Sequence, residues 1–211
     1  MPKEAGRERR GWVLSRGFLG CLAVVGLLSA CVSNRGALTA ESVADEPVPL
    51  VGVSSPEEVL AHVPDWVEEM VLAEPDAEAA ESLTTLAVDF DLTVFFGTWC
   101  SDSRRELARL WRGLELTGSL AGQPAGGTER LPIRYIGVDR EKREPGELLE
   151  GRHILYVPTF IVERDGVELG RIVEGAPNGI EVDLADLLSG DSSGLITMRE
   201  DLGRGGEDAE P

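Results

Sequence analysis

The stretch Val94-Phe95-Phe96-Gly97-Thr98-Trp99-Cys100-Ser101-Asp102-Ser103 places a cysteine where a short apolar run ends and a helical pattern begins. The apolar run has the length and composition of a buried strand. A helix is predicted over residues 101–114, because apolar residues follow at helical spacing: Leu107, Leu110, Trp111 and Leu114. A second stretch, Leu155-Tyr156-Val157-Pro158-Thr159-Phe160, begins fifty-five residues after the cysteine and leads into another apolar run.

Further elements are predicted on both sides of these stretches. Strands are expected over residues 92–96, 131–138, 159–162 and 167–173, with Arg164-Asp165-Gly166 as a hairpin signal between the last two. Helices are expected over residues 56–73, with a break at Pro64, and over residues 77–86 and 180–188. A charged segment, 139–147, leads into a short helix. Residues 56–190 are long enough for one hydrophobic core, which predicts a single α/β domain.

The order strand, helix, strand, hairpin and closing helix, joined to Trp99-Cys100 and Val157-Pro158-Thr159, resembles the thioredoxin superfamily. The resemblance implies a mixed central sheet flanked by helices. Within that superfamily, the sequence more closely resembles a bacterial subgroup of thioredoxin-like proteins that carries the motif Gly-Thr-Trp-Cys-Ser-Asp-Ser. In thioredoxins the proline at the position of Pro158 is cis and faces the catalytic cysteine. The preceding residue, here Val157, offers its backbone to an extended substrate. The resemblance thus implies catalytic roles for Cys100, Ser103 and Pro158, and substrate binding by Trp99, Val157 and Thr159.

Two positions depart from the family pattern. Ser103 stands where the second cysteine of a Cys-x-x-Cys site would be, and Val94 stands where many thioredoxins bury a carboxylate. A thiolate can attack a disulfide, but a serine hydroxyl cannot then displace it. We therefore expect Cys100, if it reacts, to act alone.

The amino-terminal residues carry a second resemblance. Residues 1–30 combine a positively charged start with an uncharged apolar run over residues 17–30, which is short for a membrane span. The run ends in Leu28-Ser29-Ala30-Cys31, which resembles the lipobox of bacterial lipoproteins. This resemblance implies cleavage before Cys31, lipid attachment to Cys31 and anchoring in the cell envelope, on the outer membrane facing the periplasm in a host with two membranes. An uncleaved anchor or an ordinary secretory signal are the alternatives, and both also imply export.

Charge and cysteine content narrow the function further. The chain has 20 basic and 38 acidic residues, of which residues 1–30 hold five and two, so the remainder carries 15 and 36. This strongly acidic balance argues against nucleic acid as a partner and against electrostatic binding to anionic lipid. Once Cys21 is removed with the leader and Cys31 is lipidated, Cys100 is the one remaining thiol, which in an exported protein indicates a reactive or intermolecular sulfur. Residues 31–55 are predicted to form a flexible tether and residues 191–211 a disordered acidic tail.

Two functions remain open at this point. In the first, Cys100 exchanges disulfides with envelope proteins or small thiols. The backbone N–H groups at the helix start favour the thiolate, as do Arg104 and Arg105, whereas Asp102 opposes it. In the second, the domain is a non-catalytic lipoprotein module that binds an envelope protein in a groove beside Pro158, and Cys100 only packs. No cofactor and no metal are expected, because His62 and His153 are the only histidines and neither lies in a ligand cluster.

Overall fold

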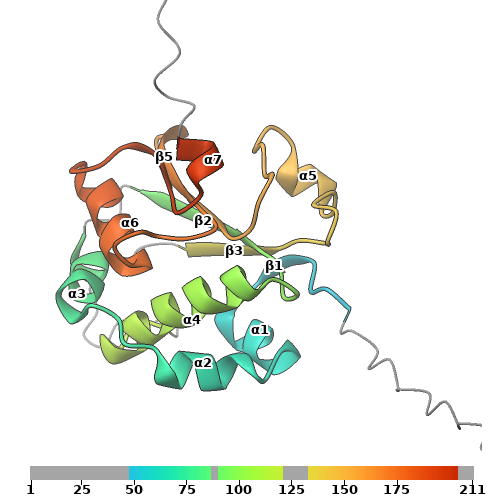
Figure 1. Cartoon of the computed structure of the whole chain (residues 1–211), viewed down its shortest axis with the longest axis horizontal. Helices are drawn as coiled ribbons and strands as arrows, with labels where there is room; N and C mark the ends of the chain where they lie inside the picture. Colours follow the sequence, from blue (N-terminus) through green and yellow to red (C-terminus); the bar gives the residue numbers. More distant parts are fainter. Residues whose placement is uncertain (1–47, 87–89, 121–132, 204–211) are drawn as a thin grey trace, which may run out of the picture. The chain divides into compact units, whose positions relative to one another are not determined.

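The computed structural model describes residues 48–86, 90–120 and 133–203, which belong to one compact unit. This unit is a single mixed α/β domain (Figure 1). Its strands are β1 (Gly52–Ser54), β2 (Asp91–Phe96), β3 (Ile133–Gly137), β4 (Thr159–Arg164), β5 (Val167–Val173) and β6 (Gly194–Thr197). Its helices are α1 (Pro56–His62), α2 (Trp66–Leu72), α3 (Ala77–Thr85), α4 (Ser101–Leu116), α5 (Gly146–Leu149), α6 (Ile180–Ser189) and α7 (Glu200–Gly203).

The described strands form one six-stranded sheet in the order β1-β3-β2-β4-β5-β6. The central strand β2 pairs parallel with β3 and antiparallel with β4, and β4 pairs antiparallel with β5. At the edges, β1 is antiparallel to β3 and β6 is parallel to β5. The predicted mixed sheet flanked by helices is therefore confirmed at this level.

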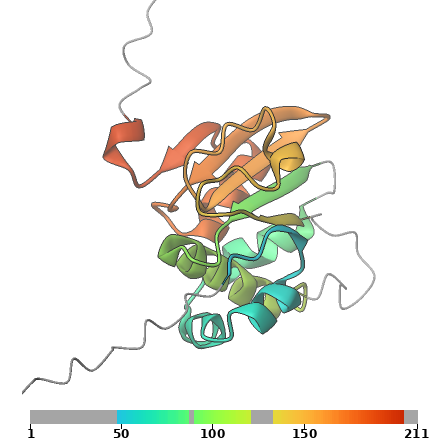
Figure 2. The ribbon, with the colours of Figure 1, turned by 90° about the vertical axis from the view of Figure 1, so that its right-hand side faces the viewer.

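Helices and connecting segments lie on both faces of the sheet (Figure 1; Figure 2), and the hydrophobic clusters buried on the two faces differ in size. The larger hydrophobic cluster joins one face to α1, α2, α3, α4 and α6. The smaller cluster lies on the other face, where Phe95, Ile136 and Ile161 pack against the segment that connects β3 to β4, including α5. Residues of β2 alternate between the two clusters, as expected for a central strand with both faces covered.

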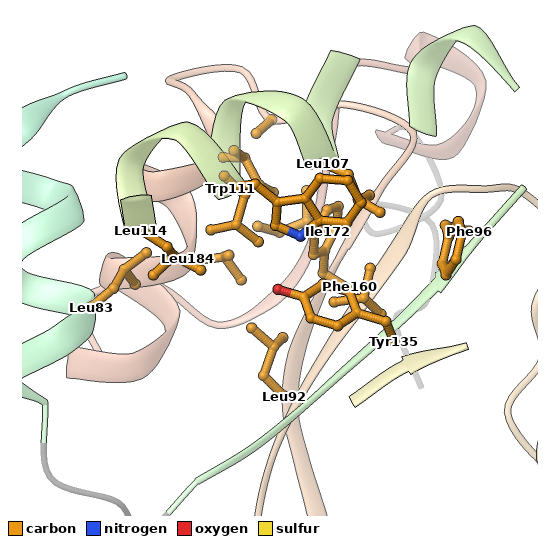
Figure 3. Close-up of a cluster of buried hydrophobic side chains, with 14 of the residues drawn as sticks. Leu83, Leu92, Phe96, Leu107, Trp111, Leu114, Tyr135, Phe160, Ile172 and Leu184 are labelled. Carbon is orange, nitrogen blue, oxygen red and sulfur yellow. The ribbon is translucent and has the colours of Figure 1, made fainter. Parts of the chain in front are cut away.

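Trp111 fixes α4 on the sheet (Figure 3). Its side chain is fully buried, and its ring lies 6.2 Å from that of Trp66 and 5.8 Å, edge-on, from that of Tyr135. Aromatic pairs in these arrangements add to the free energy gained by burying their apolar area. Because α4 is held along its length by this packing, the position of its first residue, directly after Cys100, is also set.

Local signals explain several boundaries. α1 begins with a capping box in which the Ser55 side chain accepts from the Glu58 N–H and the Glu58 side chain accepts from the Ser55 N–H. The chain leaves α1 before Pro64 and resumes as α2, as the predicted break requires. At the β4–β5 hairpin, Asp165 and Gly166 both have positive φ, 52° and 76°, which is the turn that an Asp-Gly pair favours.

Two predicted boundaries are wrong. Residues 52–54 of the predicted 31–55 tether form β1, and residues 194–203 of the predicted 191–211 tail form β6 and α7. Both strands are three or four residues long, and their partners, rather than their own composition, make them strands. Two glycines let them approach: a Cβ atom on Gly137 would collide with the Leu50 carbonyl oxygen, and one on Gly170 would lie 2.7 Å from the Gly194 oxygen.

The predicted leader, the lipid site at Cys31 and most of the tether lie outside the described residues, as do residues 204–211. Within residues 48–86, 90–120 and 133–203, no helix is both long and apolar enough to cross a membrane.

Candidate functional site

Cys100 lies at the point where β2 gives way to α4. It is the N-cap residue of the helix, and its carbonyl accepts the first helical hydrogen bond, from the Arg104 N–H at 3.1 Å. Its own N–H donates to the Gly97 carbonyl at 3.0 Å, which closes the turn after the strand. The side chain is half-buried and is a free thiol. The sequence prediction of a cysteine at the start of a helix, directly after a buried strand, is therefore confirmed.

The sulfur of Cys100 contacts the segment around Pro158. The thiol donates to the Val157 carbonyl oxygen at an Sγ–O distance of 3.1 Å, which joins two residues 57 positions apart in the chain. The Val157–Pro158 peptide bond is cis, as the resemblance implied. The structure thus brings together Cys100, Val157 and Pro158, which the sequence assigned to one site.

The other side chains assigned to substrate binding on this segment are buried. Val157 and Thr159 are 3% and 1% exposed. The Thr159 hydroxyl donates to the Tyr156 carbonyl at 2.7 Å, and the Pro158 carbonyl accepts from the Glu174 N–H at 2.8 Å. Pro158 is buried as well, so this segment supports the thiol from within the protein, and Thr159 fixes the turn that precedes β4.

The next residue of the site is Trp99, which directly precedes Cys100 in the chain. Its half-buried indole N–H donates to the Val138 carbonyl at 3.2 Å, which ties it to the end of β3. Two cationic groups lie over the ring, the Arg140 guanidinium at 5.5 Å and the Lys142 ammonium at 5.6 Å from the centroid. The indole also packs with Cys100 against the smaller hydrophobic cluster. These contacts account for the position of Trp99, and its role in substrate binding stays a prediction.

Ser103 has a structural contact that the sequence did not indicate. Its side chain is completely buried, and its hydroxyl oxygen accepts from the Gly97 N–H at 3.1 Å. A backbone N–H buried without a partner would cost about 1–3 kcal/mol, so this bond supports the turn that carries Cys100. The geometry gives Ser103 a role in holding the turn.

The arginines near the start of α4 are paired with carboxylates. Arg104 lies 3.5 Å from Asp65 and 3.4 Å from Glu69, both outside α4. Arg105 lies 2.6 Å from Asp102 and 3.0 Å from Glu106. The sequence predicted that both guanidinium groups would favour a Cys100 thiolate, but each is balanced by a nearby negative charge.

Three buried carboxylates, Glu106, Glu181 and Asp183, were not predicted from the sequence. Burial raises the pKa of Glu106, and the hydrogen bond from Arg105 opposes that rise. The Glu181 side chain is fully buried, where Arg109 binds both of its oxygens, with distances from 2.6 to 3.1 Å, and the Asp76 N–H donates to it at 2.6 Å. Glu181 therefore links α4 and α6 to the start of α3. The available sequence signal was a pair of acidic residues, Glu181 and Asp183, in the first turn of α6.

The described residues offer no site for a metal ion. Within residues 48–86, 90–120 and 133–203, no three histidine, cysteine, aspartate or glutamate residues lie close enough together to bind one. The His62 ring contacts the Val48 carbonyl at 2.7 Å, and His153 is exposed.

No family model matches the chain, and no curated protein matches it. Among solved structures, an HIV epitope scaffold is 17% identical with a TM-score of 0.42, over 65% of this chain and 91% of that chain. A protein of unknown function from Pseudomonas aeruginosa is 17% identical with a TM-score of 0.36, over 64% of this chain and 81% of that chain. At these TM-scores neither likeness indicates a function.

Proposed function

We propose that this protein is a thioredoxin-like lipoprotein of the cell envelope that exchanges disulfides through the single thiol of Cys100. The strand order β3-β2-β4-β5, with α4 crossing between the parallel strands β2 and β3, supports the thioredoxin-like assignment. The Leu28-Ser29-Ala30-Cys31 motif supports export and lipid anchoring. The proposed partners are envelope proteins with thiols or disulfides, and small thiols.

The observation that carries the proposal is the contact between the Cys100 sulfur and the Val157 carbonyl, 3.1 Å apart. It places a half-buried thiol at a helix start, against the backbone that precedes Pro158. The N–H groups of the first helical turn stabilise negative charge at such a position. Because Val157 and Pro158 are buried, the half-buried sulfur is the part of this site that a partner's disulfide would reach.

The proposed reaction has two exchange steps. The Cys100 thiolate attacks one sulfur of a disulfide, a new sulfur–sulfur bond forms, and the other sulfur leaves as a thiolate with the electron pair of the broken bond. A second thiolate from outside the protein then attacks the mixed disulfide, and Cys100 leaves as a thiolate. Ser103 cannot take the second role, because its hydroxyl is buried and already accepts the Gly97 N–H. This chemistry suits isomerisation or reversible capping of a thiol, and it does not suit net reduction.

The alternative function is a binding module in which Cys100 only packs. One observation favours it: Arg104 and Arg105, the cations nearest to Cys100 along the chain, are each paired with carboxylates. Arginines that are paired with carboxylates favour a thiolate less than unpaired ones would, which leaves a larger share of any activation to the helix start. In this alternative, the surface beside Pro158 binds a protein partner without covalent chemistry.

The substitution Cys100→Ser separates the two functions. In cells that make the parent chain, trapping thiols with acid and separating proteins without reductant is expected to show mixed disulfides, all of which Cys100→Ser abolishes. The control variant Ser101→Ala, which changes the exposed neighbouring residue, is expected to keep them. Co-purification of the same partners with parent and Cys100→Ser chains, with no reductant-sensitive species, would reject disulfide exchange in favour of the binding module.

A further inference from the structure

The C-terminal segment, residues 194–203, returns to the Pro158 side of the site. β6 pairs with β5 along Gly170–Val173, and the Thr197 hydroxyl donates to the Val173 carbonyl at 2.9 Å. The Arg199 N–H then donates to the same Thr197 oxygen at 3.1 Å. These bonds fix where the backbone of Arg199 lies, one residue before α7 begins.

The Arg199 guanidinium joins three side chains. It lies over the Tyr156 ring, 4.0 Å from the centroid, and it donates to the Glu174 carboxylate at 2.8 Å. It also donates two hydrogen bonds, at 2.9 and 2.8 Å, to the carboxylate of Asp201. A planar guanidinium can stack on an aromatic ring and bind carboxylates at its edges at the same time, which an ammonium group cannot do.

Two of these partners flank the Val157–Pro158 peptide. Tyr156 directly precedes Val157, and the Glu174 N–H donates to the Pro158 carbonyl at 2.8 Å. Glu174 has a φ of 63°, a left-handed conformation that residues other than glycine rarely adopt. Such a conformation persists where surrounding contacts hold it, and the bond to Arg199 is one of them.

We infer that Arg199 is a positioning residue for exchange at Cys100. By binding Tyr156 and Glu174, which contact the residues around the Val157–Pro158 peptide, it fixes the Val157 carbonyl beside the sulfur, at the place of the proposed exchange. The inference rests on the proposed function, because it concerns substrates of the same thiol. It assigns a role in the site to a segment that lies outside the predicted domain.

The test compares a reagent that needs only the thiol with a substrate that must also dock. The full chain is reacted with iodoacetamide, followed at Cys100 by peptide mapping. It is also reacted with a short peptide whose cysteine carries a thionitrobenzoate group. Attack by Cys100 forms the protein–peptide disulfide and releases the coloured thionitrobenzoate anion. The rate with a Cys100→Ser chain is subtracted to remove other thiols.

In Arg199→Gln, we expect the peptide rate to fall about fivefold, as loss of one stacked and ion-paired arginine implies. The iodoacetamide rate should not change. Arg199→Lys should give an intermediate peptide rate, because it keeps the charge near Glu174 and loses the stacking on Tyr156. Arg112→Gln, which removes an arginine whose partner is Glu115 on the same helix, should change neither rate.

A second variant keeps the test decisive if Arg199→Gln is poorly folded. Tyr156→Leu should slow the peptide reaction, and the double variant with Arg199→Gln should be no slower than the slower single variant, since both act through one contact. Equal changes in the two rates, no change in either, or additive effects in the double variant would overturn the inference. A parent Cys100 that reacts with neither reagent would instead overturn the proposed function and the inference with it.

Discussion

Replacing Ser103 with alanine separates a structural role of this residue from a chemical one. The parent hydroxyl is fully buried and accepts the Gly97 N–H at 3.1 Å, three residues before the thiol. Alanine leaves that N–H without a partner in a site closed to water. The cost of an unpaired buried donor is about 1–3 kcal/mol, and we take about 2 kcal/mol for this neutral group. Each kcal/mol shifts the melting temperature by roughly 2–4 °C in a domain of about 150 residues, so the expected decrease is about 4–8 °C.

The measurement is thermal and urea unfolding of parent, Ser103→Ala and the matched control Ser101→Ala. Ser101 is exposed and begins α4, so its replacement should change the free energy of unfolding by no more than about 0.5 kcal/mol. Alkylation of Cys100 by iodoacetamide should persist in both variants. Equal stability of the two variants, together with loss of thiol reactivity in Ser103→Ala, would refute the structural role and assign Ser103 to the chemistry.

Two further outcomes follow from the buried charges. Arg109→Leu leaves the fully buried Glu181 carboxylate without a counter-ion, so urea titrations should show the free energy of unfolding lowered by about 3 kcal/mol or more. The control Arg112→Leu, which removes an ion pair with a half-exposed partner, should lower it by less than about 1 kcal/mol. Equal losses in the two variants would contradict this. Burial raises the pKa of Glu106, so the folded chain binds the proton of this carboxyl group more tightly than the unfolded chain does. The free energy of unfolding therefore falls as the pH rises from the pKa of Glu106 in the unfolded chain through its pKa in the folded chain. Glu106→Gln should therefore stabilise the protein at pH 7 and lose this advantage below about pH 4; a constant difference across that range would count against it.

The central strands and helices could be predicted from the sequence because their own residues specify them. The apolar run of β2, the hairpin at Asp165-Gly166 and the apolar stripe of α4 are local signals, and the structure places these elements within two residues of the predicted ends. The contact between Cys100 and Val157 was anticipated only through the family resemblance, since no local pattern relates residues 57 positions apart.

The remaining features depend on tertiary partners. β1 and β6 are too short for their residues to show an alternating pattern. The sequence signals available were Gly137 and Gly170, which lie in the neighbouring strands β3 and β5. Burial of Glu181 depends on Arg109, which lies 72 residues away. Arg199 lies in the predicted disordered tail, and its place at the site depends on the pairing of β6 with β5.

The most direct measurement is the intact mass of the full chain after incubation with a small disulfide near neutral pH and acid quenching, with the adduct located by peptide mapping. The proposed exchange requires one adduct on the peptide that contains Cys100, its absence in Cys100→Ser, and its removal by an added thiol. A Cys100 peptide that stays unmodified under conditions in which a free cysteine in solution is fully converted would contradict disulfide exchange at this site.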